Sequence, residues 1–408
     1  MERLKSNLLN RFLSFVRIYS ESNTEAADSG IFPSTPQQWD LAKVLEQELK
    51  ALGLENVQIT PDCYVYGYLP ATKKFEGDRP FCLLSHMDTV DEVTGKNVNP
   101  LVHENYKGTD IKLSCDVTHS TKTDSFLKEA IGETIITSDG TTLLGADDKA
   151  GVAEIISSIE YVITNKIEHR PIEVIFSPDE ETGHGMDKVP LELLKSKYAY
   201  TVDGGHKCEL ETECFNAWKS DVIFTGKACH TGSAKNVMIN ANLMAAKFIS
   251  MLPKNELPET TENYEGFYAV MGTESSIESA KVSLLLRDFT LEGIKNRIQT
   301  VDSIAKKVAE ETRGQIKTEH TQQYLNMKTV LDKNPSVTEK LINAYKSAGI
   351  EPVFVPIRGG TDGSRLTEMG IPCPNIFTGD HNFHSRLEWA SLDQMLLACK
   401  VLINLMIN

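Results

Sequence analysis

The sequence contains no run of apolar residues long enough for a membrane-spanning helix, which needs about 18 to 20 in succession. Positive charge is also in deficit, because 42 Lys and Arg stand against 57 Asp and Glu. Nucleic acids and acidic lipid surfaces attract clustered Lys and Arg, so the net charge of −15 disfavours both. Aromatic residues make up only 7% and are too dispersed for a base-stacking platform. We therefore expect no nucleic-acid partner and no membrane partner.

The eight cysteines form no C-x-x-C pair, and no G-x-S-x-G nucleophile motif occurs. Thiols scattered through 408 residues are typical of a reduced compartment rather than of a disulfide-stapled secreted protein. Charges interrupt the apolar residues of segment 1–20, which favours an amphipathic surface helix over a signal peptide. These features predict a cytoplasmic protein.

Apolar periodicity predicts helices that alternate with short, wholly apolar strands. The strands are too apolar to be half exposed, so we expect them in the centre of a sheet that helices cover on both faces. Gly53 and Gly349 stand where helix C-caps are expected, and Asp139-Gly140 is a hairpin signal. The predicted helices are 2–19, 37–52, 148–164, 335–348 and 391–406; the predicted strands are 81–84, 172–176, 199–202, 353–356 and 375–378.

The pattern changes between about 213 and 321, where strand, helix, two strands, helix and strand follow one another. This βαββαβ order predicts a ferredoxin-like α+β domain, 213–321, inserted into a larger one. The larger domain is then discontinuous, 1–212 and 322–408, and of the α/β class with a mixed, mostly parallel sheet.

Acidic and histidine residues follow the ends of the predicted central strands. In open α/β sheets ligands bind where such loops meet. Carboxylates gathered there repel one another unless a cation neutralises them, and a pair of metal ions would do so. Histidine and carboxylate ligands without cysteine suit Zn²⁺, Co²⁺ or Mn²⁺. The loops are 85–89 (SHMDT), 145–151 (GADDKAG), 177–183 (SPDEETG), 202–205 (VDGG) and 380–384 (DHNFH).

Two metal ions can polarise a carbonyl and activate water, after which a carboxylate is needed as general base. In the Glu180-Glu181 pair, one residue would bind metal and the other would accept the proton. In His86-x-Asp88, the aspartate would hold the second ring N–H of a ligating histidine. Spacing alone does not choose between His381 and His384.

These motifs, together with GKACHTGSAK (226–235), RDF (287–289), PIRGGTDGSRL (356–366) and NFHSR (382–386), resemble the zinc-dependent M20 metallopeptidases along nearly the whole chain. Within that family the similarity is to aminopeptidases that act on tripeptides. The resemblance implies a catalytic domain of the zinc-peptidase type that binds two Zn²⁺ ions, with Co²⁺ or Mn²⁺ as possible substitutes. One ion would be held by His86, Asp147 and Asp203, and the other by Asp147, Glu181 and His384.

The resemblance also implies that Asp88 orients His86 and that Glu180 is the general base. Asp147 is preferred to Asp148 as the bridging ligand because the family's bridging aspartate lies two residues before the lysine of its D-x-K motif. Asp148 suits the N-cap of helix 149–164. His384 is preferred to His381 because of the Ser385 that follows it.

The inserted domain, as a lid, would supply substrate-binding residues. His230 resembles the family histidine that stabilises the developing oxyanion. Arg287 and Arg358 resemble carboxylate-binding arginines, and a free peptide ends in a carboxylate. We therefore expect short peptides as substrates, preferably tripeptides with free N- and C-termini, and a homodimer is a possible assembly. The alternatives are another M20-type hydrolase (a dipeptidase, carboxypeptidase or N-acyl amino acid deacylase) and a non-catalytic, metal-containing peptide-binding protein.

Overall fold

The computed structural model describes residues 1–408, which form two compact units. The first unit comprises 1–212, 329–355 and 361–408, and the second comprises 213–328 and 356–360. Relative to the predicted boundaries, the second unit also takes in 322–328 and 356–360. Strand β14 (Gln315–Tyr324) runs past residue 321, and Ile357 pairs with Cys214 in an isolated β-bridge.

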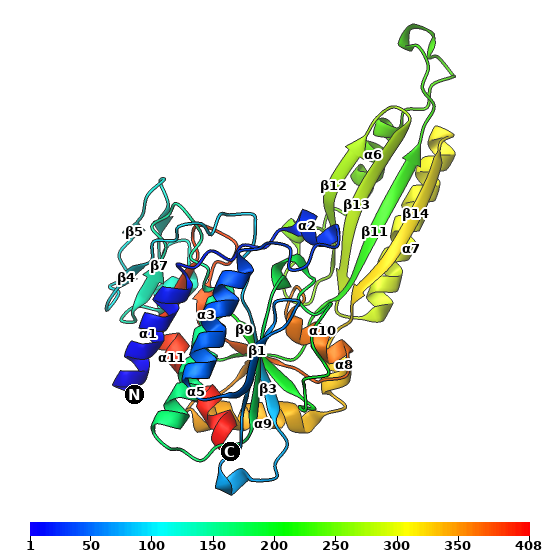
Figure 1. Cartoon of the computed structure of the whole chain (residues 1–408). Helices are drawn as coiled ribbons and strands as arrows, with labels where there is room; N and C mark the ends of the chain where they lie inside the picture. The colour runs from blue at the N-terminus through cyan, green and yellow to red at the C-terminus, as the bar shows by residue number, and fades with distance from the viewer. The chain divides into compact units, whose positions relative to one another are not determined.

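An eight-stranded mixed sheet forms the centre of the first unit (Figure 1). Its four middle strands, β8, β3, β9 and β16, run parallel to one another, and β2 and β10 flank them in antiparallel orientation. The carboxyl ends of the four parallel strands therefore meet at one edge. In spatial order the strands are β1 (Glu55–Ile59), β2 (Val65–Leu69), β8 (Ile172–Ser177), β3 (Phe81–His86), β9 (Ala199–Gly204), β16 (Asn375–Phe377), β10 (Glu209–Glu211) and β15 (Val353–Phe354).

Eleven helices accompany the sheets. The predicted caps of α3 and α9 are confirmed, because Gly53 and Gly349 follow these helices with φ of 83° and 81°. The first helix ends at Phe15 instead of residue 19, since the chain beyond it pairs elsewhere: the Ile18 carbonyl accepts from Lys149 and the Ser20 carbonyl from the Thr89 N–H. The helices are α1 (Glu2–Phe15), α2 (Thr24–Asp28), α3 (Gln38–Ala51), α4 (Ser125–Glu129), α5 (Ala146–Thr164), α6 (Ala241–Ser250), α7 (Leu291–Thr312), α8 (Lys328–Leu331), α9 (Pro335–Ser347), α10 (Asp362–Glu368) and α11 (Leu392–Ile407).

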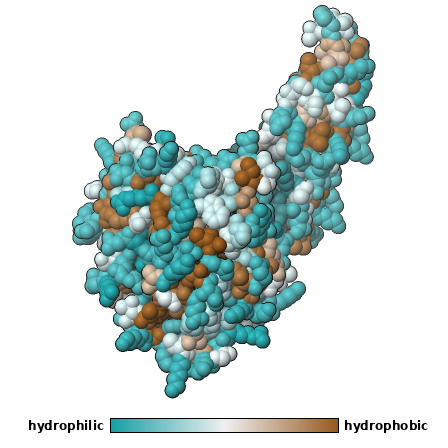
Figure 2. Space-filling model, in the orientation of Figure 1, coloured by the Kyte–Doolittle hydropathy of each residue, from teal (hydrophilic) through white to brown (hydrophobic).

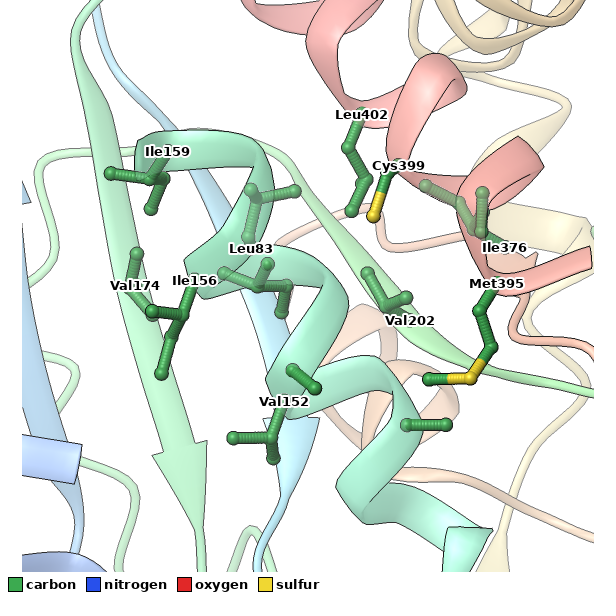
Figure 3. Packing of buried hydrophobic residues seen from close by; sticks show 14 of the residues in the cluster. Leu83, Val152, Ile156, Ile159, Val174, Val202, Ile376, Met395, Cys399 and Leu402 are labelled. Atoms are coloured by element: carbon green, nitrogen blue, oxygen red, sulfur yellow. The ribbon is translucent and has the colours of Figure 1, made fainter. Parts of the chain in front are cut away.

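Side chains of the middle strands alternate between two cores, because successive strand residues point to opposite faces. In β3, Phe81 and Leu83 join the larger core, while Cys82 and Leu84 join a smaller one that contains Leu366 of α10. Figure 3 shows how α5 packs in the larger core between the sheet and α11. Both faces of the middle strands are thus buried, as the apolar runs predicted.

Two of the predicted strand features are wrong. The run at 353–356 forms only a two-residue edge strand, β15, whose Val353 and Phe354 are 53% and 55% exposed. The Asp139-Gly140 hairpin does not form either. Strand β7 instead pairs with β4 and β18, and the backbone N–H groups of 144–147 donate to the side chain of Glu388. This small sheet consists of β17 (Asp380–His381), β18 (Trp389–Ser391), β7 (Ile135–Thr137) and β4 (Leu101–His103), and a separate ribbon pairs β5 (Ile111–Lys112) with β6 (Thr118–His119).

The second unit is a four-stranded antiparallel sheet with helices α6 and α7 packed on it. Its strand, helix, strand, strand, helix, strand sequence confirms the predicted βαββαβ order. In space the strands are β12 (Phe267–Ser275), β13 (Ser279–Asp288), β11 (Asn216–Thr225) and β14.

No helix is long and apolar enough to cross a membrane. On the face drawn in Figure 2, hydrophobic residues form separate patches among hydrophilic ones.

Candidate metal centre and catalytic site

Polar side chains collect where the parallel strands of the large sheet end. His86 is the last residue of β3, and Asp203 is the penultimate residue of β9. Glu180 and Glu181 lie in the short 3-10 helix η2 (Glu180–Thr182) that follows β8. Two further residues join them: Asp147, at the start of α5, and His384, in the loop beyond β16 and β17.

Asp147 lies between two imidazoles. Its Oδ1 is 2.9 Å from Nε2 of His86, and its Oδ2 is 3.4 Å from Nε2 of His384. Each histidine contacts one more carboxylate through the same nitrogen: His86 contacts Asp203 at 3.6 Å, and His384 contacts Glu181 at 3.0 Å. The five residues therefore form two groups of contacting side chains that share Asp147.

Asp88 connects the two sides of this arrangement. His86 Nδ1 lies 3.1 Å from the Asp88 carbonyl and 3.4 Å from its carboxylate, so Nε2 is the ring nitrogen that faces the cluster. The Asp88 carboxylate also accepts the backbone N–H groups of Glu180 at 3.0 Å and Glu181 at 3.1 Å. The main-chain carbonyl and the carboxylate of this one buried residue thus both face the imidazole, and the carboxylate fixes the turn that carries both glutamates.

Burial is the largest influence on the carboxylates of the cluster. It raises the pKa of Glu181 to about 8, that of Glu180 well above the usual range, and that of Asp203 as well. Asp147 differs: burial acts to raise its pKa, but the contacts with His384 and His86 lower it below the usual value.

The two histidines respond in the opposite direction. Burial acts to lower their pKa values, but the surrounding carboxylates outweigh it. The pKa of His86 is raised well above the usual range, and that of His384 to about 11. The buried carboxylates therefore favour positive charge on both imidazoles.

The N-terminal end of α5 approaches β9 unusually closely. A Cβ atom on Gly151 would lie 1.9 Å from the backbone carbonyl oxygen of Val202, so only glycine fits there. This approach brings Asp147 and Asp203 to the same nitrogen of His86.

Asp148 adjoins the cluster but its carboxylate is occupied. It is joined to Asp147 by a cis peptide bond. Its Oδ1 accepts the Gly151 N–H at 3.1 Å, and its Oδ2 accepts the His86 N–H at 3.1 Å and the Ser85 hydroxyl. The backbone of Asp147 and Asp148 is non-helical, so the regular part of α5 begins after them. Although ligand atoms of Asp148, His86 and Asp203 lie within 4.8 Å of one another, the bond to Gly151 makes Asp148 the N-cap of that regular part.

The two histidines of the C-terminal loop have different surroundings. His381 is buried and stacks on Trp389 with ring centroids 4.0 Å apart, and burial lowers its pKa to about 3. His384 instead contacts Asp147 and Glu181. The geometry therefore distinguishes two residues that spacing did not.

The other candidates, His230, Arg287 and Arg358, belong to the second unit. His230 is exposed, and its Nδ1 accepts the Gly232 N–H at 3.2 Å, which puts the ring proton of the neutral form on Nε2. Arg287 is 8% exposed and donates to the Leu286 carbonyl at 3.1 Å. Arg358 donates to the carbonyls of Asn263 and Glu265, each at 2.8 Å. Both guanidinium groups thus have main-chain partners.

Sequence reasoning missed three buried carboxylates around the site: Asp179, Asp362 and Glu388. Asp179 has a left-handed backbone (φ 57°) and accepts the Ser34 N–H at 2.7 Å and the Gln38 side-chain amide at 2.6 Å, which ties η2 to a distant segment. Asp362 accepts from Ser177, and burial raises its pKa to about 8. The strand-end loop 177–183 contains Asp179 and the motif PIRGGTDGSRL contains Asp362, whereas no local pattern marks Glu388.

The residues present fit a pair of divalent metal ions. Imidazole nitrogen and carboxylate oxygen are ligands that Zn²⁺ accepts, and ligand atoms of His86, Asp147 and Glu181 already lie within 4.8 Å of one another. Bound cations would ionise the carboxylates whose pKa burial raises and would displace the protons that the histidines hold. Both the donor set and its charge therefore favour metal binding.

Comparison with known proteins gives one consistent family. The model of peptidase family M20/M25/M40 matches residues 139–408. A peptidase T of Clostridium perfringens is 44% identical over 398 residues, 97% of either chain. A peptidase T of Alkaliphilus oremlandii is 41% identical over 408 residues, 98% of either chain.

Two solved structures have the same fold. An aminopeptidase PepT from Bacillus cereus aligns with a TM-score of 0.76 at 24% identity, covering 98% of each chain. A tripeptidase from Staphylococcus aureus aligns with a TM-score of 0.77 at 22% identity, covering 99% of this chain and 98% of its own.

Proposed function

The chain belongs to peptidase family M20/M25/M40, and from this premise we propose that it is a zinc-dependent aminopeptidase that removes the N-terminal residue from tripeptides. Relatives named peptidase T are 41–45% identical along 97–98% of the chain, which supports the substrate class. The observation that carries the catalytic part is the contact of one carboxylate, that of Asp147, with two imidazoles.

We assign one ion to His86, Asp147 and Asp203, and the other to Asp147, Glu181 and His384. The mixture of imidazole and carboxylate without thiolate suits Zn²⁺, and the same donors accept Co²⁺ or Mn²⁺. When bound, the two ions would polarise the scissile carbonyl and lower the pKa of the attacking water.

The remaining chemistry belongs to side chains of the protein. Asp88 keeps the proton of His86 on Nδ1, so that Nε2 presents its lone pair to the site. Glu180 accepts a proton from water as the water oxygen bonds to the scissile carbonyl carbon, and delivers it to the nitrogen as the C–N bond breaks. One water is consumed, and a tripeptide yields an amino acid and a dipeptide.

The second unit would bind the substrate. We assign His230 to the developing oxyanion, because its Nε2 is the ring nitrogen left to donate. Arg287 and Arg358 remain our candidates for binding the terminal carboxylate of the peptide. To do so, each guanidinium group would give up its hydrogen bonds to main-chain carbonyls. A cytoplasmic location and a homodimer stay predictions.

A peptide-length series tests the substrate class. Purified protein, loaded with Zn²⁺ and assayed for metal content, should release the N-terminal residue from a tripeptide faster than from the matching dipeptide and tetrapeptide. Equal turnover of all three would remove the tripeptide preference. N-acetylation of the tripeptide should abolish turnover, whereas an N-acyl amino acid deacylase would tolerate it.

A pair of variants tests the general base. Glu180→Gln should lower kcat by about 10²- to 10⁴-fold with little change in bound metal, because the variant loses proton transfer alone. Glu192→Gln, at an exposed glutamate of the same unit, is the control and should keep full activity. Rapid turnover by Glu180→Gln would exclude the assigned role, and tight peptide binding without product in the wild type would favour the non-catalytic alternative.

A further inference from the structure

Glu388 gathers four consecutive backbone N–H groups on one side-chain carboxylate. Its Oε2 accepts from Leu144 at 2.7 Å and Gly145 at 2.8 Å, and its Oε1 accepts from Ala146 at 2.6 Å and Asp147 at 3.1 Å. The residue is 1% exposed, so water does not compete for these bonds. The backbone that leads into Asp147 is therefore held from one point.

The same residue ends the loop that carries His384. Within this loop, the Glu388 N–H donates to the Ser385 carbonyl at 3.3 Å, and the Asn382 side chain donates to the Leu387 carbonyl at 3.1 Å. His384 itself has a left-handed backbone, with φ of 55°. The internal bonds make the loop a closed turn, and Glu388 joins that turn to the segment 144–147.

Only a carboxylate can make this set of bonds. Both of its oxygens accept hydrogen bonds, whereas an amide of the same shape places an NH₂ group where one oxygen was. That NH₂ group would face backbone N–H donors and leave them unpaired in a buried place. The buried ammonium of Lys149 also interacts electrostatically with Glu388.

We propose that Glu388 is a positioning residue that sets the spacing of Asp147 and His384 and thereby the affinity of the shared metal site. This inference rests on the proposed function only in taking those two residues as metal ligands. Outer residues that orient metal ligands typically change metal affinity about 10- to 100-fold when they are substituted.

Titration of the metal-free protein with Co²⁺, followed by visible absorption, tests the proposal without any peptide. Glu388→Gln should bind Co²⁺ about 10- to 100-fold more weakly than the wild type. Glu388→Asp keeps both carboxylate oxygens on a shorter side chain, so its Co²⁺ affinity should lie between those of the wild type and Glu388→Gln. If the Gln variant does not fold, the Asp variant decides the comparison with the wild type.

Glu173→Gln is the matched control for a purely structural role. Glu173 is also fully buried, and it accepts the Lys195 and Ser196 N–H groups, each at 2.9 Å from one of its oxygens, away from the metal site. Its substitution should destabilise the protein to unfolding yet leave Co²⁺ affinity unchanged.

Unchanged Co²⁺ affinity in the Glu388 variants would overturn the proposal. A loss of Co²⁺ affinity in Glu173→Gln as large as that in Glu388→Gln would also overturn it. A wild type that binds Co²⁺ but hydrolyses no tripeptide would refute the proposed function. The affinities of the variants would in that case still decide the role of Glu388.

Discussion

Asp88→Asn is the substitution that tests the site most sharply, because Asp88 joins three of its parts. The side chain is fully buried and accepts the backbone N–H groups of Glu180 at 3.0 Å and Glu181 at 3.1 Å on different oxygens. The oxygen that accepts from Glu180 is also 3.4 Å from Nδ1 of His86. The proposed general base on η2 and the proposed metal ligands on η2 and β3 thus all contact Asp88.

Asparagine has the same shape but only one acceptor oxygen. One of the two N–H groups loses a charge-assisted hydrogen bond and faces an NH₂ group, which should lower the unfolding free energy by about 1.5–3 kcal/mol. Metal affinity should fall about 10- to 100-fold, because the turn that carries Glu181 loses a hydrogen bond and His86 loses the nearby negative charge, although its bond to the main-chain carbonyl of residue 88 stays. At saturating Zn²⁺, kcat should still be about 10²-fold lower, since a displacement of Glu180 near 1 Å has that effect.

Urea denaturation of the metal-free protein, Co²⁺ titration and steady-state kinetics at saturating Zn²⁺ measure these three quantities. Asp139→Asn is the control, because Asp139 also accepts hydrogen bonds on both oxygens, from the N–H and hydroxyl of Thr141 and from the side chain of Asn99, but in a turn outside the cluster. If Asp88→Asn matched the control in metal affinity and in kcat, the assigned role of Asp88 would be refuted.

Other predictions concern the core, a close packing contact and pH. Ile156→Ala, in the core between α5 and the sheet (Figure 3), should lower the unfolding free energy by about 2–5 kcal/mol in urea denaturation while KM stays unchanged. Gly151→Ala should lower both Tm and Co²⁺ affinity, because the new Cβ would force α5 away from β9. Co²⁺ binding should tighten from about pH 6 to pH 9 and release protons, seen by calorimetry in two buffers, because metal must displace protons from His86, His384 and Glu181. In the metal-free protein the pKa of His384 is raised to about 11, above its unfolded value of about 6.5. Protonated His384 therefore stabilises the folded protein fully below about pH 6.5, and this stabilisation fades as the pH rises towards 11. The difference in Tm between the wild type and His384→Ala should accordingly narrow over that range.

Much of the fold could be predicted because local signals and burial agree in the middle of the sheet. Short apolar runs such as 81–84 and 172–176 form strands that are buried on both faces. The predicted glycines after α3 and α9 cap these two helices. The run at 353–356 is just as apolar, yet it lies at an edge. A strand's position depends on its neighbours, and its own residues do not encode which neighbours it will have.

The failed hairpin has a similar cause. Asp139-Gly140 has the residues of a tight turn, but hydrogen bonds over long sequence distances decide the path of the chain beyond it. Strand β7 pairs with β18, and the N–H groups of 144–147 go to Glu388, more than 240 residues away along the chain. Pairings of this kind leave no periodic trace in the segment itself.

By itself, the sequence determined which chemistry was available. It predicted strand ends with imidazole and carboxylate groups, no cysteine ligands, and an order of motifs that resembles one peptidase family. These properties follow from residue type and spacing along the chain, which local rules can read.

Only the tertiary structure decided how those groups are shared. It put His384 against Asp147 and Glu181 while His381 stacks on Trp389, and it gave Asp148 to the cap of α5. It also revealed Asp179 and Glu388, buried carboxylates that hold the loops of the site. The physical reason is that a buried carboxylate must find its hydrogen bonds wherever the fold brings donors, and those donors are distant in sequence.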